Sequence, residues 1–346
     1  MIAHKTYPVH DSPLFKLKSR KKLANSIFKV DLRYLETLAS RSDNFHSSRR
    51  WTGGKWRLVE CPKKLVGDLL KRLFWFLSRI EKPDYLHSGV RKRSYITNAE
   101  VHAACVPLAK IDIRKFFQSV NGARVARFFT QTLQCSPDVA GLLTRLVTFQ
   151  NHLPIGACTS EVLAFFATRS MFDELCAFAH SRKVKMTCYV DNLAFSGTGV
   201  NRRFLWHVRR VMHNHGFGYH EYRCYSASET KRVTGLLLDG RRIRVLPAKA
   251  LLFWDGLKAL GGIADSQREA ALRKLIGLGG TLGHIERRYR RAVRPLAREV
   301  AKSKIATTLP RISARAQQDA DSKNLLPWEE SNRFSPEAAG SRQTAT

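Results

Sequence analysis

Residues 108–117 read LAKIDIRKFF, an apolar strand-like run that carries a carboxylate at Asp112. A second run of the same kind, residues 187–196, reads TCYVDNLAFS and carries Asp191. Burying an unpaired ionised carboxylate is costly, so each acid needs a physical reason to be there. Two carboxylates brought together would repel each other unless a cation lay between them, and Mg²⁺ is the usual cation. The two runs therefore predict strands that bring their acidic residues together around a divalent cation.

The second run also has the pattern of a β-hairpin. Apolar residues alternate up to Val190, the pair Asp191-Asn192 interrupts them, and the alternation resumes at Leu193. Asp and Asn both tolerate the positive φ that tight hairpin tips require. We therefore expect the tip at Asp191-Asn192, with the acid at a sharp, exposed turn that a ligand can reach.

The charge balance of the 346-residue chain indicates a polyanionic partner. Sixty Lys and Arg stand against 28 Asp and Glu, which gives a formal net charge of +32. Such an excess favours nucleic acid or a membrane surface. No apolar stretch approaches spanning length, because residues 162–179 carry Arg169, Asp173 and Glu174, and the first residues lack the apolar core of a signal peptide. Nucleic acid is therefore the expected partner, and no membrane is expected.

The cysteines favour a cytoplasmic location. There are seven of them, scattered along the chain and without a CxxC pair. An odd, scattered set of this kind is typical of reduced thiols rather than of a disulfide framework.

Composition and periodicity divide the chain into four parts. Residues 1–97 are basic and mainly helical in pattern, and residues 98–246 mix strands with helices and hold both acidic runs. Residues 247–313 are helical and very basic. Residues 314–346 contain many small polar residues and few large apolar ones, so we expect them to be disordered.

Several local elements are also expected. Pro13 near a first turn predicts a helix that runs from Ser12 to Lys22, and alternation predicts a strand over Lys55–Pro62. Apolar residues at helical spacing predict one long buried helix over 163–175. Gly279-Gly280 and Gly283 are expected to interrupt the basic helical segment.

Acids on strands in a basic protein suit nucleotidyl transfer. That reaction needs in-line attack of a 3′-hydroxyl on an α-phosphate, with two divalent cations stabilising the attacking and leaving oxygens. Asp112 and Asp191 are the candidates to hold these cations. A helix-capping or turn role is the alternative for either residue.

Short motifs along the chain resemble those of bacterial retron reverse transcriptases. Three match the polymerase core of that family and two, NAxxH and VTG, match signatures of its retron members: NAEVH at 98–102, IDIRKFF at 111–117, HLPIGACTS at 152–160, YVDN at 189–192 and VTG at 233–235. The opening SPLFKLKS at 12–19 is also similar to retron enzymes. The resemblance covers roughly residues 10–300, and several motifs in the right order are a strong signal.

The resemblance implies an α/β (α+β) right-hand polymerase. An N-terminal extension and fingers would occupy 1–97, an antiparallel-sheet palm with part of the fingers 98–246, and a helical thumb 247–313. The implied activity is RNA-directed DNA synthesis with two Mg²⁺ ions (Mn²⁺ is the substitute) and deoxynucleoside triphosphates. The template and primer would be a structured non-coding RNA, extended from an internal 2′-hydroxyl into an RNA–DNA hybrid. An effector or toxin protein and defence against phage are implied as well.

The resemblance also assigns roles to single residues. Catalysis is assigned to Asp112, Asp191 and Asn192, and metal binding to these three together with Ile113. Nucleotide binding is assigned to Lys55, Arg57, Phe117, Gly156 and Ser160. An Arg suits a triphosphate because its planar fork donates bidentately, and a ring under the sugar would clash with a ribose 2′-hydroxyl. The alternative is a solvated strand face for Lys55 and Arg57, and plain core packing for Phe117.

The sequence departs from the family pattern at several positions. Asn192 replaces the second Asp of the Tyr-x-Asp-Asp motif, Ile155 replaces a glutamine and Glu161 replaces a proline, while Arg223 stands near a usual lysine. One charge lost at about 4 Å is worth roughly 1–4 kcal/mol, or about ten- to a thousandfold in rate. The alternative function is therefore a catalytically impaired RNA-binding scaffold that kept the fold. A group II intron maturase is a third interpretation, which the retron signatures weaken.

Three further features have two interpretations each. His213, His215 and His220 suggest zinc, but no Cys or further His stands at ligand spacing, so a solvated or RNA-facing cluster is favoured. The run Arg287–Arg298 fits a solvated helix face or nucleic-acid backbone contact, and the net charge favours the second. The VTG motif fits RNA recognition or a tight strand turn.

Overall fold

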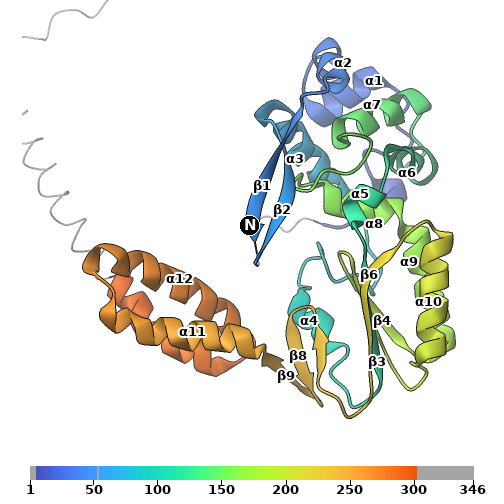
Figure 1. Ribbon diagram of the computed structural model, residues 1–346. Helices are drawn as coiled ribbons and strands as arrows, with labels where there is room; N and C mark the ends of the chain where they lie inside the picture. The colour runs from blue at the N-terminus through green and yellow to red at the C-terminus, as the bar shows by residue number, and fades with distance from the viewer. Residues whose placement is uncertain (1–4, 53, 302–346) are drawn as a thin grey trace, which may run out of the picture. The chain divides into compact units, whose positions relative to one another are not determined.

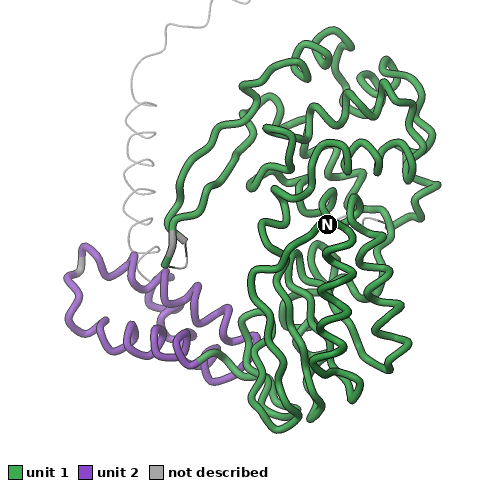
Figure 2. Tube along the Cα trace, turned by 45° about the vertical axis from the view of Figure 1, so that its right-hand side comes forward, with its two compact units in different colours: residues 1–246 green, residues 247–346 purple. Residues whose placement is uncertain are grey.

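The computed structural model describes residues 5–52 and 54–301. The chain forms two compact units, residues 1–246 and 247–346, which Figure 2 colours separately. Residues 1–97 and 98–246 share the first unit and one buried core. The expected disordered tail, and the end of the expected helical segment, lie outside the described residues. In the described part of the chain, no helix combines the length and the apolar character needed to cross a membrane.

Figure 1 labels the elements of the first unit. Its strands are β1 Phe45–Thr52, β2 Lys55–Pro62, β3 Leu108–Ile113, β4 Lys185–Tyr189, β5 Asn192–Ser196, β6 Tyr219–Tyr225, β7 Lys231–Val233, β8 Leu236–Asp239 and β9 Arg242–Val245. Its α-helices are α1 Arg20–Lys22, α2 Leu32–Ser40, α3 Lys64–Ser78, α4 Tyr95–Glu100, α5 Phe116–Ser119, α6 Gly122–Arg127, α7 Pro137–Val147, α8 Ser160–Ala167, α9 Arg169–Ser181 and α10 Arg202–Asn214. Short 3₁₀ or π segments are η1 Val9–Asp11, η2 Leu23–Phe28 and η3 Phe128–Thr132.

A four-stranded antiparallel sheet in the order β4-β5-β3-β6 carries both acidic runs. Helices α9 and α10 lie side by side next to this sheet (Figure 1). Side chains alternate along β3, so Ile111 and Ile113 are buried while Lys110 and Asp112 lie on the other face and remain partly exposed. Asp112 is paired with Asn192 across β3 and β5. The prediction that the two acidic runs are strands that meet is confirmed, as is the mixed α/β class with antiparallel sheets.

Two helix predictions are wrong. Residues 12–16 form turns instead of a helix, because Lys16 adopts a left-handed φ of 53° and its N–H donates to the carbonyl of Leu133. The expected single helix over 163–175 is broken at Thr168, whose hydroxyl donates to the carbonyl of Ala164. The strand expected over Lys55–Pro62 is confirmed as β2, the partner of β1.

The segment that follows α4 ties the acidic hairpin to the rest of the unit. His102 is fully buried, with Nδ1 2.7 Å from Ser196 Oγ and Nε2 2.7 Å from Thr187 Oγ1. Thr187 lies on β4 and Ser196 on β5, so one imidazole is bonded to both strands of the hairpin that presents Asp191. Each ring nitrogen has a partner, as a buried polar side chain requires.

The turn between β7 and β8 packs against α4. Thr234 and Gly235 have positive φ values of 42° and 77°, which close the hairpin in two residues. The Thr234 hydroxyl donates to the carbonyl of Tyr95 at 2.9 Å, and Asn98 Nδ2 lies 3.5 Å from the same hydroxyl. These contacts favour a tight strand turn for the VTG motif, since its one polar side chain is bonded within the protein.

His102 is expected to make the fold sensitive to acid. Burial, aided by the charges of His87 and Lys185, lowers the pKa of His102 to about 3, whereas the unfolded chain titrates near 6.5. Because the folded pKa is the lower one, the stability that the neutral ring contributes is complete above pH 6.5 and is lost as the pH falls. On the order of 1–2 kcal/mol should be lost between pH 6.5 and 5. Urea unfolding at several pH values measures this loss.

The matched comparison uses His102→Asn and the exposed His10→Asn. The first variant should be less stable at neutral pH, because Thr187 and Ser196 lose their partner, but it should lose less stability on acidification than the unaltered protein. His10→Asn should follow the unaltered protein. Equal pH slopes for His102→Asn and the unaltered protein would contradict the assignment.

The second unit is helical. Its elements are α11 Pro247–Ala259, η4 Leu260–Gly262, α12 Asp265–Gly283 and a helical stretch over residues 287–301. The predicted interruption at Gly279-Gly280 is wrong, because α12 continues through both glycines, whereas the one predicted at Gly283 is confirmed, because α12 ends there. A Cβ at Gly279 would collide with Phe253 and Val293, so this glycine permits α12 to lie close against its neighbours.

Candidate active site

A cavity of about 550 Å³ lies where β3 ends and the β4–β5 turn begins. Asp112 enters it from β3 and Asp191 from the turn, so the structure brings together the two acids singled out from the sequence. The remaining lining residues are Arg57, Ile113, Arg114, Lys115, Phe116, Phe117, Gln118, Ile155 and His220. No ion pair of either acid with a lysine or arginine is found among the described residues. The space between the two carboxylates is therefore available to a cation.

The turn that presents Asp191 differs from the predicted one by one residue. Tyr189 pairs with Asn192, so the two-residue tip is Val190-Asp191, and Asn192 opens β5. Val190 takes the left-handed conformation, with φ of 58°, which is strained for a β-branched residue. Its N–H donates to Ser88 Oγ at 2.9 Å, and this bond helps to hold the turn. The expectation that Asp191-Asn192 would form the tip is wrong for that reason.

Both carboxylates are costly to ionise in this cavity. Burial, followed by the charge of Asp191, raises the pKa of Asp112 to about 6. Burial also raises the pKa of Asp191, while the amide of Asn192 and the charge of Arg57 oppose this shift. A cation bound between the two ionised acids would stabilise them, because it would remove the repulsion that burial strengthens.

The donor set fits a hard divalent cation. Mg²⁺ is typically held by one or two carboxylates, with water and substrate phosphates completing the shell. Asp112 and Asp191 supply the carboxylates, and no cluster of three or more His, Cys, Asp or Glu side chains suited to a metal occurs in the described residues. Asn192 Nδ2 donates to Asp191 Oδ1 at 2.8 Å, so the Asn192 amide orients the Asp191 carboxylate. Ile113 lines the same cavity, and a ligand role for its carbonyl stays a prediction.

Two of the expected nucleotide-binding residues line the cavity. These are Arg57 on β2 and Phe117 on α5, and Phe117 is half-buried. Lys55 lies on β2, but its side chain is outside what the structure describes. Sequence analysis missed Arg114, Lys115 and His220. Arg114 and Lys115 follow Asp112 in one motif, and that adjacency was the signal that would have found them.

Gly156 and Ser160 shape the loop that reaches the cavity at Ile155. Gly156 has φ of +129°, and a Cβ there would lie 3.0 Å from the carbonyl oxygen of Glu60. The Ser160 hydroxyl donates to the carbonyl of Pro154 at 2.6 Å and is buried. Both residues therefore support the loop, and direct contact of either with a nucleotide stays a prediction.

Buried Glu60 fixes this loop to β2. Its N–H donates to the Ile155 carbonyl at 2.6 Å, and its carboxylate accepts from the Ile155 N–H at 3.1 Å. His152 Nε2 lies 3.0 Å from the same carboxylate.

The residues His213, His215 and His220 do not gather at one site, because His215 contacts Glu174 while His220 lines the cavity. The structure thus favours the non-zinc interpretation.

Comparison with known proteins finds several retron reverse transcriptases that are similar to this chain. No protein-family model matches the sequence. The chain is 34% identical over 111 residues to the Retron Se72 reverse transcriptase of Salmonella heidelberg, which covers 32% of this chain and 29% of that protein. It is 24% identical over 190 residues to the Retron Ec86 reverse transcriptase of Escherichia coli (53% and 57%), and 28% identical over 209 residues to the Retron Mx65 reverse transcriptase of Myxococcus xanthus (54% and 49%). These similarities support a place for the chain among the retron reverse transcriptases.

The matches span only part of these retron reverse transcriptases, between 29% and 57% of their lengths. In this chain, the two segments that resemble retron signatures touch each other, since Asn98 of NAxxH meets Thr234 of VTG. His102 of the first signature then reaches the hairpin that carries Asp191. The signatures therefore have a structural role in this chain, which is to support the acidic turn.

Proposed function

We propose that this chain is an RNA-directed DNA polymerase that copies a structured RNA with the help of divalent cations. The observation that carries the proposal is the convergence of Asp112 and Asp191 on one cavity that Arg57 also lines. The sequence similarity to retron reverse transcriptases supports the same activity. In this proposal the sheet β4-β5-β3-β6 is the palm, the β1–β2 hairpin belongs to the fingers and the second unit is the thumb.

Each cavity residue would have a chemical task. Asp112 and Asp191, with the carbonyl of Ile113 and the amide of Asn192, would hold two Mg²⁺ ions. These ions would supply charge stabilisation to the attacking and leaving oxygens. Arg57 would orient the triphosphate through paired N–H donors, and Phe117 would pack under the sugar. None of these four ligands needs to gain or lose a proton during the reaction for these roles.

The template would be bound mainly through its backbone. The net charge of +32 supplies an attraction that does not depend on sequence and that weakens with salt. The basic run Arg287–Arg298 in the second unit is our candidate for contacts with an RNA–DNA hybrid. A cytoplasmic location, an effector protein and a role in defence against phage stay predictions from the family resemblance.

Primer extension tests the proposal. The purified full chain is incubated with poly(rA)·oligo(dT), labelled dTTP and Mg²⁺ or Mn²⁺, and in parallel with the RNA that copurifies with it. We expect labelled DNA in the presence of either cation and none with a chelator. Absence of product with both templates and both cations, in a protein that still binds RNA, would overturn the proposal.

A non-catalytic RNA-binding scaffold is the second candidate. Asn192 favours it, because the cavity holds one negative charge fewer than a Tyr-x-Asp-Asp site would. The extension assay separates the two candidates, since a scaffold binds RNA without forming DNA.

Phe117→Ala is expected to relax sugar selection. Removing the ring opens space where a 2′-hydroxyl would otherwise clash, so the preference for dTTP over UTP in kcat/KM should fall by roughly tenfold to a hundredfold. Single-nucleotide incorporation measures the preference. Phe76→Ala, which removes another half-buried ring far from the cavity, is the control and should leave it unchanged. A lower rate for Phe117→Ala with an unchanged preference would indicate packing alone.

A further inference from the structure

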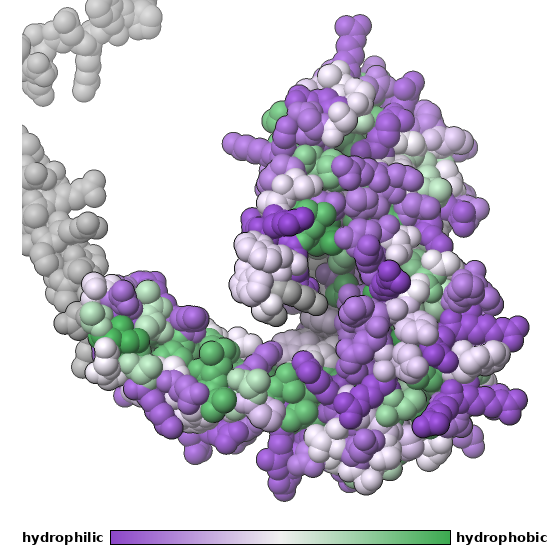
Figure 3. Space-filling view, in the orientation of Figure 1, coloured by the Kyte–Doolittle hydropathy of each residue, from purple (hydrophilic) through white to green (hydrophobic). Residues whose placement is uncertain are grey.

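Helix α10 presents a basic face that the polymerase proposal does not use. Its apolar side buries Phe204, Val208 and Val211, and the Phe204 ring lies 5.4 Å from that of Phe195 on β5, so this side faces the sheet. The opposite side exposes Arg203, Trp206 and Arg210, which recur at i, i+3 and i+7. No acidic residue occurs anywhere in Arg202–Asn214. Figure 3 shows hydrophilic side chains along the edge of the molecule where α10 lies.

The arginines of this face are not neutralised by the protein. Within the described residues, no ion pair involves Arg182, Arg202, Arg203, Arg209 or Arg210. Some exposed arginines elsewhere have carboxylate partners, as in Arg20–Glu36, Arg41–Asp43 and Arg268–Glu299, whereas this helix carries four arginines and no such pair in the part of the chain that the structure describes. An uncompensated cluster of positive charge is costly without an anionic partner, so this face complements an anion.

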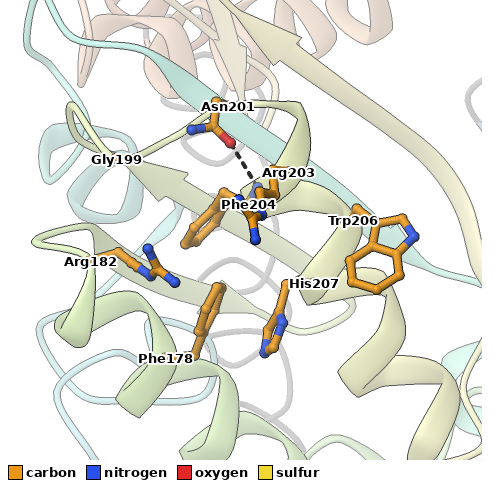
Figure 4. A pocket seen from close by; sticks show the side chains of 8 residues that line it. All are labelled: Phe178, Arg182, Gly199, Asn201, Arg203, Phe204, Trp206 and His207. Carbon is orange, nitrogen blue, oxygen red and sulfur yellow. Dashed lines mark hydrogen bonds between the residues drawn. The ribbon is translucent and has the colours of Figure 1, made fainter.

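A pocket of about 400 Å³ opens between α9 and α10 beside Trp206 (Figure 4). Phe178 stacks on His207 at 4.0 Å and on Phe204 at 5.0 Å, which gives the pocket a wall of flat rings. Arg182 and Arg203 line the same pocket. Its size and its lining of rings and guanidinium groups suit a nucleobase with its phosphate.

Trp206 is the exposed aromatic of this face. Its side chain is 51% exposed, and the Arg210 guanidinium lies 5.5 Å from its ring. An exposed indole with a cation over it is a stacking platform for an unpaired base. A duplex keeps its bases stacked inside, so this feature selects single-stranded nucleic acid.

A second pocket continues the basic face toward β6. It has a volume of about 550 Å³ and is lined by Arg202, Arg209 and Tyr222 among others. The Arg209 guanidinium lies 4.8 Å from the Tyr222 ring, and its Nε is a buried donor with no hydrogen-bond partner in the described residues. A phosphate bound in this pocket could accept a hydrogen bond from this unpaired donor.

We propose that the outer face of α10 is a second nucleic-acid site, which binds a single-stranded segment by stacking on Trp206 and by phosphate contacts to Arg203 and Arg210. Asp112 lies on the opposite face of the sheet from the one that α9 and α10 cover, so this site is separate from the catalytic cavity. The proposal concerns binding alone and does not require that the chain be catalytically active.

The test uses the full chain, a labelled oligo(U) and an excess of an unlabelled short RNA–DNA hybrid that occupies the polymerase cavity. Arg203→Ala/Trp206→Ala/Arg210→Ala should weaken oligo(U) binding by roughly tenfold to a hundredfold. The slope of log affinity against log salt should fall by about 1.4, since two phosphate contacts are lost. Trp206→Ala alone should weaken binding while leaving the salt slope unchanged.

The matched control is Lys21→Ala/Arg33→Ala/Tyr34→Ala, which removes the same charge and one exposed ring from the surface around α2. It should bind oligo(U) like the unaltered protein. Oligo(U) containing 4-thiouridine should crosslink to the tryptic peptide of residues 204–209, FLWHVR. The proposal would be overturned if both triple variants bound oligo(U) with equal affinity, or if crosslinks formed only at other peptides. Those results are expected if the face binds a protein instead of nucleic acid. Primer extension by the α10 variant should persist, which separates this result from failure of the proposed function.

Discussion

Replacing Asp112 or Asp191 with asparagine is expected to lower the rate of DNA synthesis about a thousandfold. Both carboxylates face one cavity, and each removed charge withdraws up to about 4 kcal/mol of interaction with a cation or with transition-state charge. The initial rate of dTTP incorporation on poly(rA)·oligo(dT) measures the effect. Asp112→Ala and Asp191→Ala should abolish detectable product.

Stability separates this effect from misfolding. The pKa of Asp112 is raised to about 6 in the folded protein, so its ionisation destabilises the fold as the pH rises from about 4 through 6. Without divalent cations at neutral pH, Asp112→Asn should therefore be at least as stable to heat as the unaltered protein. Added Mg²⁺ should stabilise the unaltered protein more than the variant. A variant that keeps its activity, or that loses it by unfolding, would contradict the assigned role.

Asn192→Asp is expected to raise the rate, by about tenfold to a thousandfold at limiting Mg²⁺. Asn192 does not itself line the cavity, but it pairs with Asp112 across the strands and its amide bonds to Asp191, so Asp at this position would place a third carboxylate next to the pair and strengthen cation binding. The rate as a function of Mg²⁺ concentration should shift to lower concentrations. Stability without cations should fall, because a third negative charge adds repulsion.

Asn121→Asp is the matched control for this gain. Asn121 caps α6 through a bond from the Arg124 N–H, and Asp serves equally well as a cap, so the same charge is added without loss of structure. Its rate should match that of the unaltered protein. If product forms only after Asn192→Asp, the RNA-binding scaffold is the correct function of the natural chain.

The parts of the site that sequence alone predicted are those with local causes. The apolar residues around Asp112 and Asp191 in the sequence indicate that burying these acids is costly. The register of β3 with β5 then brings the two acids together. The position of Arg57 on a strand was predicted from the alternation of residues 55–62. The short motifs added the order of the elements, which periodicity does not give.

The parts that were missed depend on contacts distant in sequence. Val190 takes the strained position of the turn although Asn is the better residue for it, and its N–H is held by Ser88 on another segment. Lys16 leaves the expected helix because its N–H meets Leu133. At Val190 and Lys16 a hydrogen bond to a distant segment, and not a propensity, accompanies the unexpected backbone. The break at Thr168 lies in a run whose apolar spacing is continuous, so periodicity could not show it.

The bonds between Glu60 and Ile155 have a mechanical consequence. Because β2 carries both Arg57 and Glu60, a displacement of the β1–β2 hairpin would displace the Ile155–Gly156 loop with it. Arg57 and Ile155 line the same cavity, so these two parts of its wall would move as a single unit.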